Sequence, residues 1–89
     1  MFISWKKSKS FLQNARSYIS NDRLGNHQLQ ILKDFDEYIE CNELGWAFDQ
    51  LEFLAENIDL PVEFWKKMFL AAKQMELENK AQRCKQYFD

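Results

Sequence analysis

The chain has 89 residues, of which 46% are hydrophobic and 29% charged, a composition that is typical of one globular domain and excludes a disordered segment. Fourteen acidic and twelve basic residues give a net charge of −2, which argues against a nucleic-acid-binding protein. Two glycines and one proline are too few for the turns of an all-β sandwich or barrel, and no apolar run approaches the roughly 18 residues of a membrane span.

Apolar residues recur at helical spacing along the chain, and they predict an all-α fold: a compact antiparallel bundle of four to five helices in a single domain, residues 1–89. The first helix is expected over roughly 4–20, with Ser4, Ser8 or Ser10 as its N-cap. After a turn, the second is expected over roughly 27–41, capped by Asn26. The apolar faces of these two helices contain Trp5, Phe11, Leu12, Ala15, Tyr18 and Ile19, and then Ile31, Leu32, Phe35, Tyr38 and Ile39.

The third helix is expected over roughly 43–58, with Asn42 as the break before it and as its N-cap. Pro61 follows this segment and suits the first turn of a fourth helix. Past Glu76 the apolar positions move to nearly the opposite side of an ideal continued helix, so we expect a kink or break near 77–79 and a short fifth helix. The residues expected to be mostly buried are Phe11, Leu12, Phe35, Ile39, Leu44, Phe48, Leu51, Ile58, Trp65, Met68, Phe69 and Ala72.

Charge is strongly segregated along the sequence. Residues 1–33 carry six Lys and Arg against one Asp, and residues 64–89 carry six against three acids. Residues 34–63 carry ten carboxylates and no Lys or Arg. Like charges at helical spacing repel each other by about a few tenths of a kcal/mol per pair. An uninterrupted acidic segment is therefore unfavourable for an isolated bundle and useful against a cationic partner.

The third predicted helix carries the candidate binding site. Its acids follow i, i+3, i+7, i+10 spacing and are expected to form one ridge beside the apolar stripe. Trp46 and Phe53 share one side, off that stripe, where large aromatics rimmed by carboxylates are typical of interface anchors. The alternatives are that both aromatics pack against another helix, and that the basic end segments neutralise the ridge. The predicted partner-binding residues are Trp46, Phe53, Asp49, Glu52, Glu56 and Asp59, with Glu37, Glu40 and Glu43 at the rim.

Few residues indicate catalysis. His27 is the only histidine and lies beside a turn, and neither a glycine-rich phosphate loop nor a Glu-x-x-His motif is present. The carboxylates lack the Asp-x-Asp-x-Asp-Gly spacing of a calcium loop. Cys41 and Cys84 are interpreted as small hydrophobic residues in a reduced, cytoplasmic compartment, and residues 1–10 lack the apolar stretch of a signal peptide. We therefore expect no enzyme activity, no metal and no cofactor.

One segment resembles a known family. Residues 35–51, Phe-Asp-Glu-Tyr-Ile-Glu-Cys-Asn-Glu-Leu-Gly-Trp-Ala-Phe-Asp-Gln-Leu, are similar to the central stretch of small helical bacterial immunity proteins. These are the cognate inhibitors of polymorphic and contact-dependent growth inhibition toxins, including the Maf-type toxins. Shared features are an acidic helix end, a polar turn with a glutamate, and a Leu/Ala-rich helix with acids one turn apart. The Leu60-Pro61-x-x-Phe64-Trp65 opening of the next helix also fits, whereas Trp46 replaces an expected small aliphatic residue.

The resemblance implies a tight one-to-one complex with the C-terminal domain of a cognate toxin, often a ribonuclease, whose active site the inhibitor covers. A dense carboxylate surface complements the basic cleft in which a nuclease holds its polyphosphate substrate, and it raises the association rate. We therefore expect an immunity protein that itself contacts no nucleic acid, membrane or small-molecule substrate. The alternative is a helical adaptor or regulatory subunit that binds another cytosolic protein.

Overall fold

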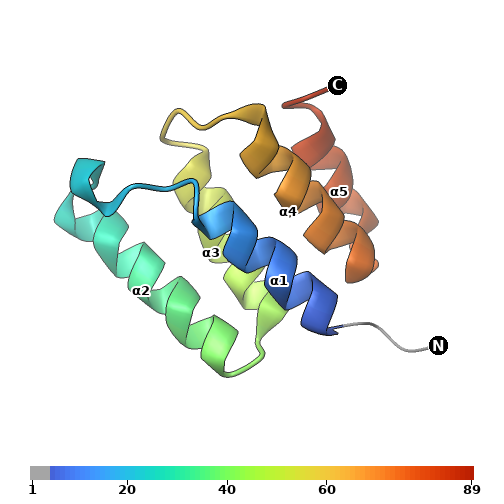
Figure 1. Ribbon diagram of the computed structural model, residues 1–89, viewed down its shortest axis with the longest axis horizontal. Helices are drawn as coiled ribbons and strands as arrows, with labels where there is room; N and C mark the ends of the chain where they lie inside the picture. The colour runs from blue at the N-terminus through green and yellow to red at the C-terminus, as the bar shows by residue number, and fades with distance from the viewer. Residues whose placement is uncertain (1–4) are drawn as a thin grey trace.

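The computed structural model describes residues 5–89, which form five α-helices and one short 3-10 helix (Figure 1). Their bounds are α1 Trp5–Arg16, η1 Asn21–Arg23, α2 Asn26–Glu40, α3 Leu44–Ala55, α4 Val62–Gln74 and α5 Glu78–Lys85. No strand occurs within this range. The prediction of an all-α bundle is confirmed, including its separate fifth helix. None of these helices is both long enough and apolar enough to cross a membrane.

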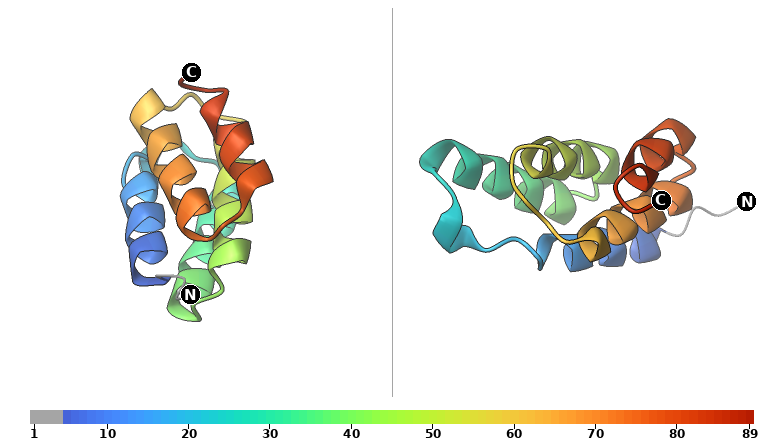
Figure 2. Two further views of the ribbon diagram at one scale, coloured as in Figure 1. Left: turned by 90° about the vertical axis from the view of Figure 1, so that its right-hand side faces the viewer. Right: turned by 90° about the horizontal axis from the view of Figure 1, so that it is seen from above.

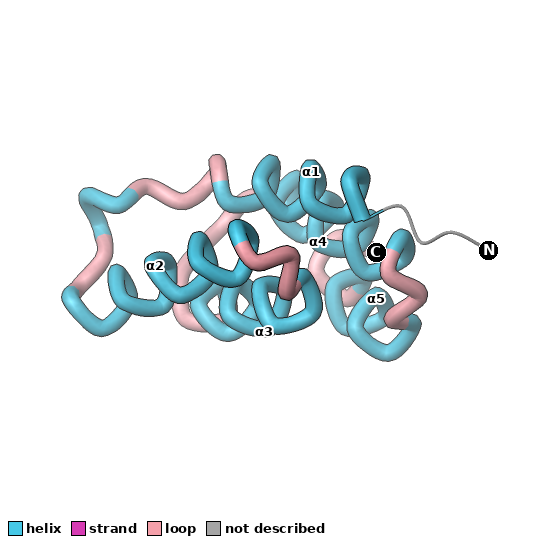
Figure 3. Tube along the Cα trace, turned by 90° about the horizontal axis from the view of Figure 1, so that it is seen from below, coloured by secondary structure: helices cyan, strands magenta, loops and turns pink. Residues whose placement is uncertain are grey.

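Consecutive α-helices alternate in direction, so the chain forms an antiparallel bundle (Figure 1). α1 and α4 lie side by side in one layer, and α2, α3 and α5 form the other (Figure 2, Figure 3). Short turns join α2 to α3 and α4 to α5, which makes each pair a helical hairpin. The molecule is flat, with principal extents of 41 × 32 × 18 Å, and one side of α3 stays open to solvent.

The hydrophobic core lies between the two layers, and α3 contributes most to it, because seven of its twelve residues are buried. Most of the residues predicted to be buried are buried: Leu12, Phe35, Ile39, Leu44, Phe48, Leu51, Trp65, Met68 and Ala72. The remaining three, Phe11, Ile58 and Phe69, are half-buried and pack against the outside of the core. Helical periodicity therefore identifies the correct inward face of α3 and α4.

The turn between α2 and α3 is a C-cap of the Schellman type. Asn42 has a φ of 57°, and the Glu43 N–H donates to the Tyr38 carbonyl at 2.9 Å. Asparagine tolerates this left-handed conformation better than most residues, because its short side chain can bond locally. The prediction that Asn42 caps the third helix is wrong, since Asn42 ends α2 and Glu43 is the N-cap residue of α3. α3 also ends before the predicted 58, at Ala55.

The turn between α4 and α5 has the same form. Glu76 has a φ of 59°, and the Leu77 N–H donates to the Ala72 carbonyl at 2.9 Å. This turn accounts for the shift of the apolar positions, so the predicted break is confirmed, slightly earlier than expected, at 75–77. The left-handed conformation costs an L-residue roughly 1–2 kcal/mol. The short side chain of asparagine offsets part of this cost by local hydrogen bonding, whereas the longer side chain of Glu76 does so less well.

Replacing this strained glutamate should stabilise the protein. Glu76→Gly should raise the free energy of unfolding by about 0.5–1 kcal/mol, because glycine adopts positive φ without a clash at Cβ. Urea denaturation followed by circular dichroism measures the change. The control is Glu78→Gly in the first turn of α5, where glycine is unfavourable by up to about 1 kcal/mol and an exposed ion pair with Lys73 is lost as well. If both variants lose stability equally, the strain at Glu76 is refuted.

The end of α1 differs from the prediction. The helix ends at Arg16 rather than near 20, because the Ser17 hydroxyl donates to the Asn14 carbonyl at 2.6 Å and competes with the next helical turn. Tyr18 then lies outside the helix and is exposed, and Trp5 is exposed at the other end. Tyr18 is therefore not part of the apolar face of α1, whereas Trp5, two turns before the buried Leu12, shares that face but lies exposed at its end.

The predicted helix starts are also displaced. Ser8 and Ser10 lie inside α1, so neither is its N-cap residue, and Ser4 lies outside the described residues. The N-cap of α2 is Gly25 rather than Asn26, and its N–H donates to a glutamine side chain of the first turn at 3.0 Å. This bond satisfies the backbone donor of the N-cap residue itself.

Candidate protein-binding surface

The side of α3 that faces away from the core carries two exposed aromatic residues. Trp46 is 59% exposed and Phe53 is 52% exposed. Their spacing of two helical turns places them on one side, about 10 Å apart along the axis. The Tyr38 ring of α2 stacks against Trp46, with the ring centroids 6.4 Å apart. We call Tyr38, Trp46 and Phe53 the aromatic face. Its exposure contradicts the alternative in which both α3 aromatics are packed beneath another helix.

Carboxylates precede and follow the α3 aromatic residues along the chain. Five of the predicted site acids are exposed and form no ion pair within residues 5–89: Glu37, Glu40, Glu43, Glu56 and Asp59. We call these five the acidic rim. The first three belong to the end of α2 and the following turn, and the other two follow the end of α3. Because residues 34–63 contain no Lys or Arg, nothing on these elements neutralises the rim.

The other two predicted acids of α3 are paired with α5. Glu52 is only 7% exposed, and its carboxylate accepts hydrogen bonds from the Arg83 guanidinium at 2.8 and 3.0 Å. These hydrogen bonds raise the pKa of Arg83. Asp49 pairs with Lys80, whose ammonium also lies 5.5 Å from the centroid of the Phe48 ring. We call the two ion pairs the α3–α5 clamp.

The clamp corrects the prediction of a single exposed ridge of four acids along α3. The first two members, Asp49 and Glu52, are neutralised within the fold, and Glu52 is buried. The alternative in which basic end segments neutralise the acids therefore holds for these two positions. The sequence contains a pattern that matches the clamp. Lys80 and Arg83 have the same i, i+3 spacing as Asp49 and Glu52, so both ion pairs join residues that are 31 positions apart.

The reactive side chains outside this surface are dispersed. Cys84 is fully buried, and burial, with a smaller effect of the Glu52 carboxylate, raises the pKa of its thiol to about 12. It therefore remains a thiol at neutral pH and packs as a small apolar group. Cys41 follows the end of α2 and His27 lies in its first turn, both exposed. A helix of this length separates them by about 20 Å, so they are not neighbours.

No protein family, curated protein or solved structure matches the chain. The functional interpretation therefore depends on the surface itself, which combines three aromatic rings with acidic ends. α3 holds this surface rigidly, because its opposite side is anchored in the core. Such a helix can present aromatic side chains to a pocket on a partner, and carboxylates to basic residues around that pocket.

Proposed function

We propose that the aromatic face and the acidic rim form a protein-binding surface, and that the protein is an immunity protein that neutralises a basic bacterial toxin domain. The observation that carries the proposal is the presence of large exposed aromatics beside carboxylates that lack an ion pair. Covering Trp46 or Phe53 would contribute roughly 2 kcal/mol each through burial of apolar area. The binding free energy is therefore most favourable with a partner that offers both an apolar pocket and positive charge.

Charge favours a different protein over a second copy of this chain. A symmetric pair formed through the α2–α3 side would bring two acidic rims together, and like charges across an interface are unfavourable. A partner with a basic surround would instead be steered toward the rim before contact. The segment that resembles immunity proteins, residues 35–51, spans the end of α2 and the first two turns of α3, where most of this surface lies.

A nuclease domain has the required chemistry. Its cleft is basic because it holds a polyphosphate, and a small acidic protein that covers the cleft excludes the substrate. Fast, electrostatically assisted association suits an inhibitor that must act before the toxin does. The aromatic face would supply the slowly dissociating contacts, and the acidic rim would supply the rate of encounter.

Co-expression with the C-terminal domain encoded by the gene directly upstream tests the proposal. We expect that domain to stop growth alone, growth to be restored by this protein, and the two to elute as a one-to-one complex in size-exclusion chromatography with light scattering. A toxic domain that is neither bound nor neutralised would overturn the immunity role. A stable complex with a domain that is not toxic would favour the helical adaptor instead.

Truncating the anchors should weaken this complex without unfolding the protein. Trp46→Ala and Phe53→Ala should each raise Kd by about 30-fold or more, mainly through faster dissociation, if each acts as a hot spot. Surface plasmon resonance against the toxin domain measures both rates. Leu70→Ala on α4 is the matched control, since Leu70 is also exposed but lies in the other layer. Equal losses for all three variants would contradict the assignment of the aromatic face.

A further inference from the structure

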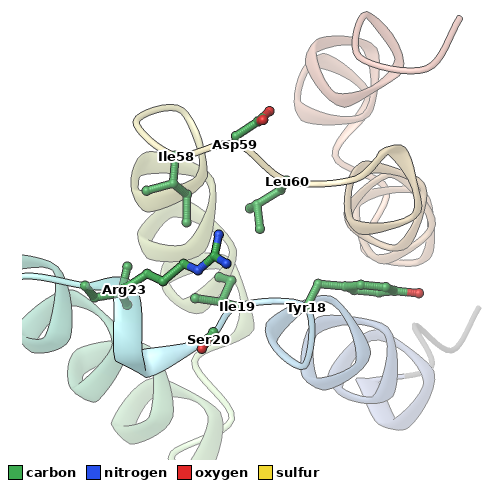
Figure 4. A pocket seen from close by; sticks show the side chains of 8 residues that line it. Tyr18, Ile19, Ser20, Arg23, Ile58, Asp59 and Leu60 are labelled. Carbon is green, nitrogen blue, oxygen red and sulfur yellow. The ribbon is translucent and has the colours of Figure 1, made fainter.

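A second feature lies away from the aromatic face, where the α1–α2 linker meets the α3–α4 linker. The two linkers enclose an open cavity of about 500 Å³, within the range of pockets that hold small ligands (Figure 4). Its walls combine polar and apolar groups in nearly equal measure, and the apolar part comes from branched aliphatic side chains of both linkers. The lining residues are Tyr18, Ile19, Ser20, Arg23, Leu24, Ile58, Asp59 and Leu60.

Arg23 gives this cavity its charge. Its side chain is exposed to solvent and extends from η1 toward Ile58 and Leu60, so that the guanidinium lies beside aliphatic groups (Figure 4). It forms no ion pair and no side-chain hydrogen bond within residues 5–89. By contrast, the other arginines of the chain, Arg16 and Arg83, are each bonded to a carboxylate. A guanidinium offers five N–H donors in a planar fork that matches a carboxylate.

The acids nearby restrict the charge of a ligand. Asp59 lines the cavity, but its carboxylate points away from the guanidinium (Figure 4). Asp22 neighbours Arg23 in the sequence and does not line the cavity. These two negative charges disfavour a dianion such as phosphate more strongly than a monoanion, which a single guanidinium can pair. The aliphatic walls require an apolar body attached to that charge.

We propose that this cavity is a binding site for a small organic monoanion, a short aliphatic chain that ends in a carboxylate. The carboxylate pairs with the Arg23 guanidinium, and the chain lies against Ile19, Ile58 and Leu60. The site shares only Asp59 with the acidic rim and no residue with the aromatic face.

Titration with three probes of equal length tests the proposal: hexanoate, hexanol and hexylammonium. Two-dimensional ¹H–¹⁵N NMR should show hexanoate moving the amide signals of residues 18–24 and 58–60, with hexanol weaker and hexylammonium weaker still. Arg23→Gln should weaken hexanoate binding about two- to fivefold, because an exposed ion pair is lost, and it should leave hexanol binding unchanged. Leu60→Ala should weaken hexanoate and hexanol alike, since it removes wall area without touching the charge.

Arg16→Gln is the matched control, because Arg16 lies in the last turn of α1 and does not line the cavity. Its affinity for hexanoate should equal that of the unmodified protein. Equal affinity for hexanoate and hexanol, or an unchanged affinity in Arg23→Gln, would show an apolar crevice only and overturn the proposal. Failure of all three probes to bind would overturn it as well.

Discussion

Leu51→Ala should lower the free energy of unfolding by about 2–5 kcal/mol, because it leaves a cavity where α3 meets the rest of the core. Leu51 is 0% exposed and lies at the centre of the buried side of α3. Domains of this size are stable by only about 5–15 kcal/mol, so the loss is a large fraction of the total. Thermal unfolding should show it as well, since each kcal/mol shifts Tm by roughly 4–8 °C in a domain of this size.

Phe53→Ala is the matched control for this prediction. Phe53 is two residues further along the same helix, it is larger than leucine, and it is 52% exposed. Its truncation should change the free energy of unfolding by less than about 0.5 kcal/mol, as is usual for surface substitutions. If Leu51→Ala is as harmless as Phe53→Ala, the assignment of the two sides of α3 is wrong.

The second large effect is expected at the α3–α5 clamp. Glu52→Lys should lower the free energy of unfolding by about 2–4 kcal/mol, because it replaces a buried, bidentate ion pair by a cation facing Arg83. The half-exposed Arg83 side chain can turn to water, which keeps the loss below that of a fully buried pair. Glu52→Lys should therefore change the stability of the fold. The sequence alone places Glu52 on the binding surface and so predicts an effect on the association rate instead.

Glu56→Lys makes the same change of charge one turn later, where the side chain is exposed and unpaired. Stability should be unchanged or slightly higher, because a cation near the C-terminus of a helix is favourable. Association with a basic partner should slow, and the slower rate should depend less on salt. Equal unfolding free energies for Glu52→Lys and Glu56→Lys would contradict the clamp.

The swapped pair provides a further control. Combining Glu52→Lys with Arg83→Glu restores opposite charges between α3 and α5, so the double variant should recover part of the stability lost by Glu52→Lys alone. Additive losses in the two single variants and the double variant would mean that Glu52 and Arg83 do not interact in solution. Urea denaturation of all three variants measures the coupling directly.

The parts of the fold that depend on helical periodicity are predictable from the sequence. The apolar stripe of α3 identifies its buried side, and the same spacing places Trp46 and Phe53 on the exposed side. The shift of apolar positions after Glu76 predicts the separation of α4 and α5. Each of these predictions concerns residues within one or two turns of each other, for which the geometry of a single helix is sufficient.

The parts that the sequence misses depend on other interactions. The α3–α5 clamp joins residues 31 positions apart, so the pairing of Glu52 with Arg83 follows from tertiary packing rather than from the pattern of α3. The early end of α1 depends on one hydroxyl of Ser17 that bonds to the backbone. The cavity around Arg23 is formed by two linkers, which carry no periodic signal.

The two sides of α3 also divide the helix into positions that should evolve at different rates. Core positions such as Phe48 and Leu51 tolerate few substitutions, because a change in side-chain volume disturbs the close packing of their neighbours. Trp46 and Phe53, on the opposite side, can be exchanged with little effect on folding. With the binding role proposed above, partner specificity can therefore change rapidly on a helix whose core residues stay constant, so that the same fold serves for a changing partner.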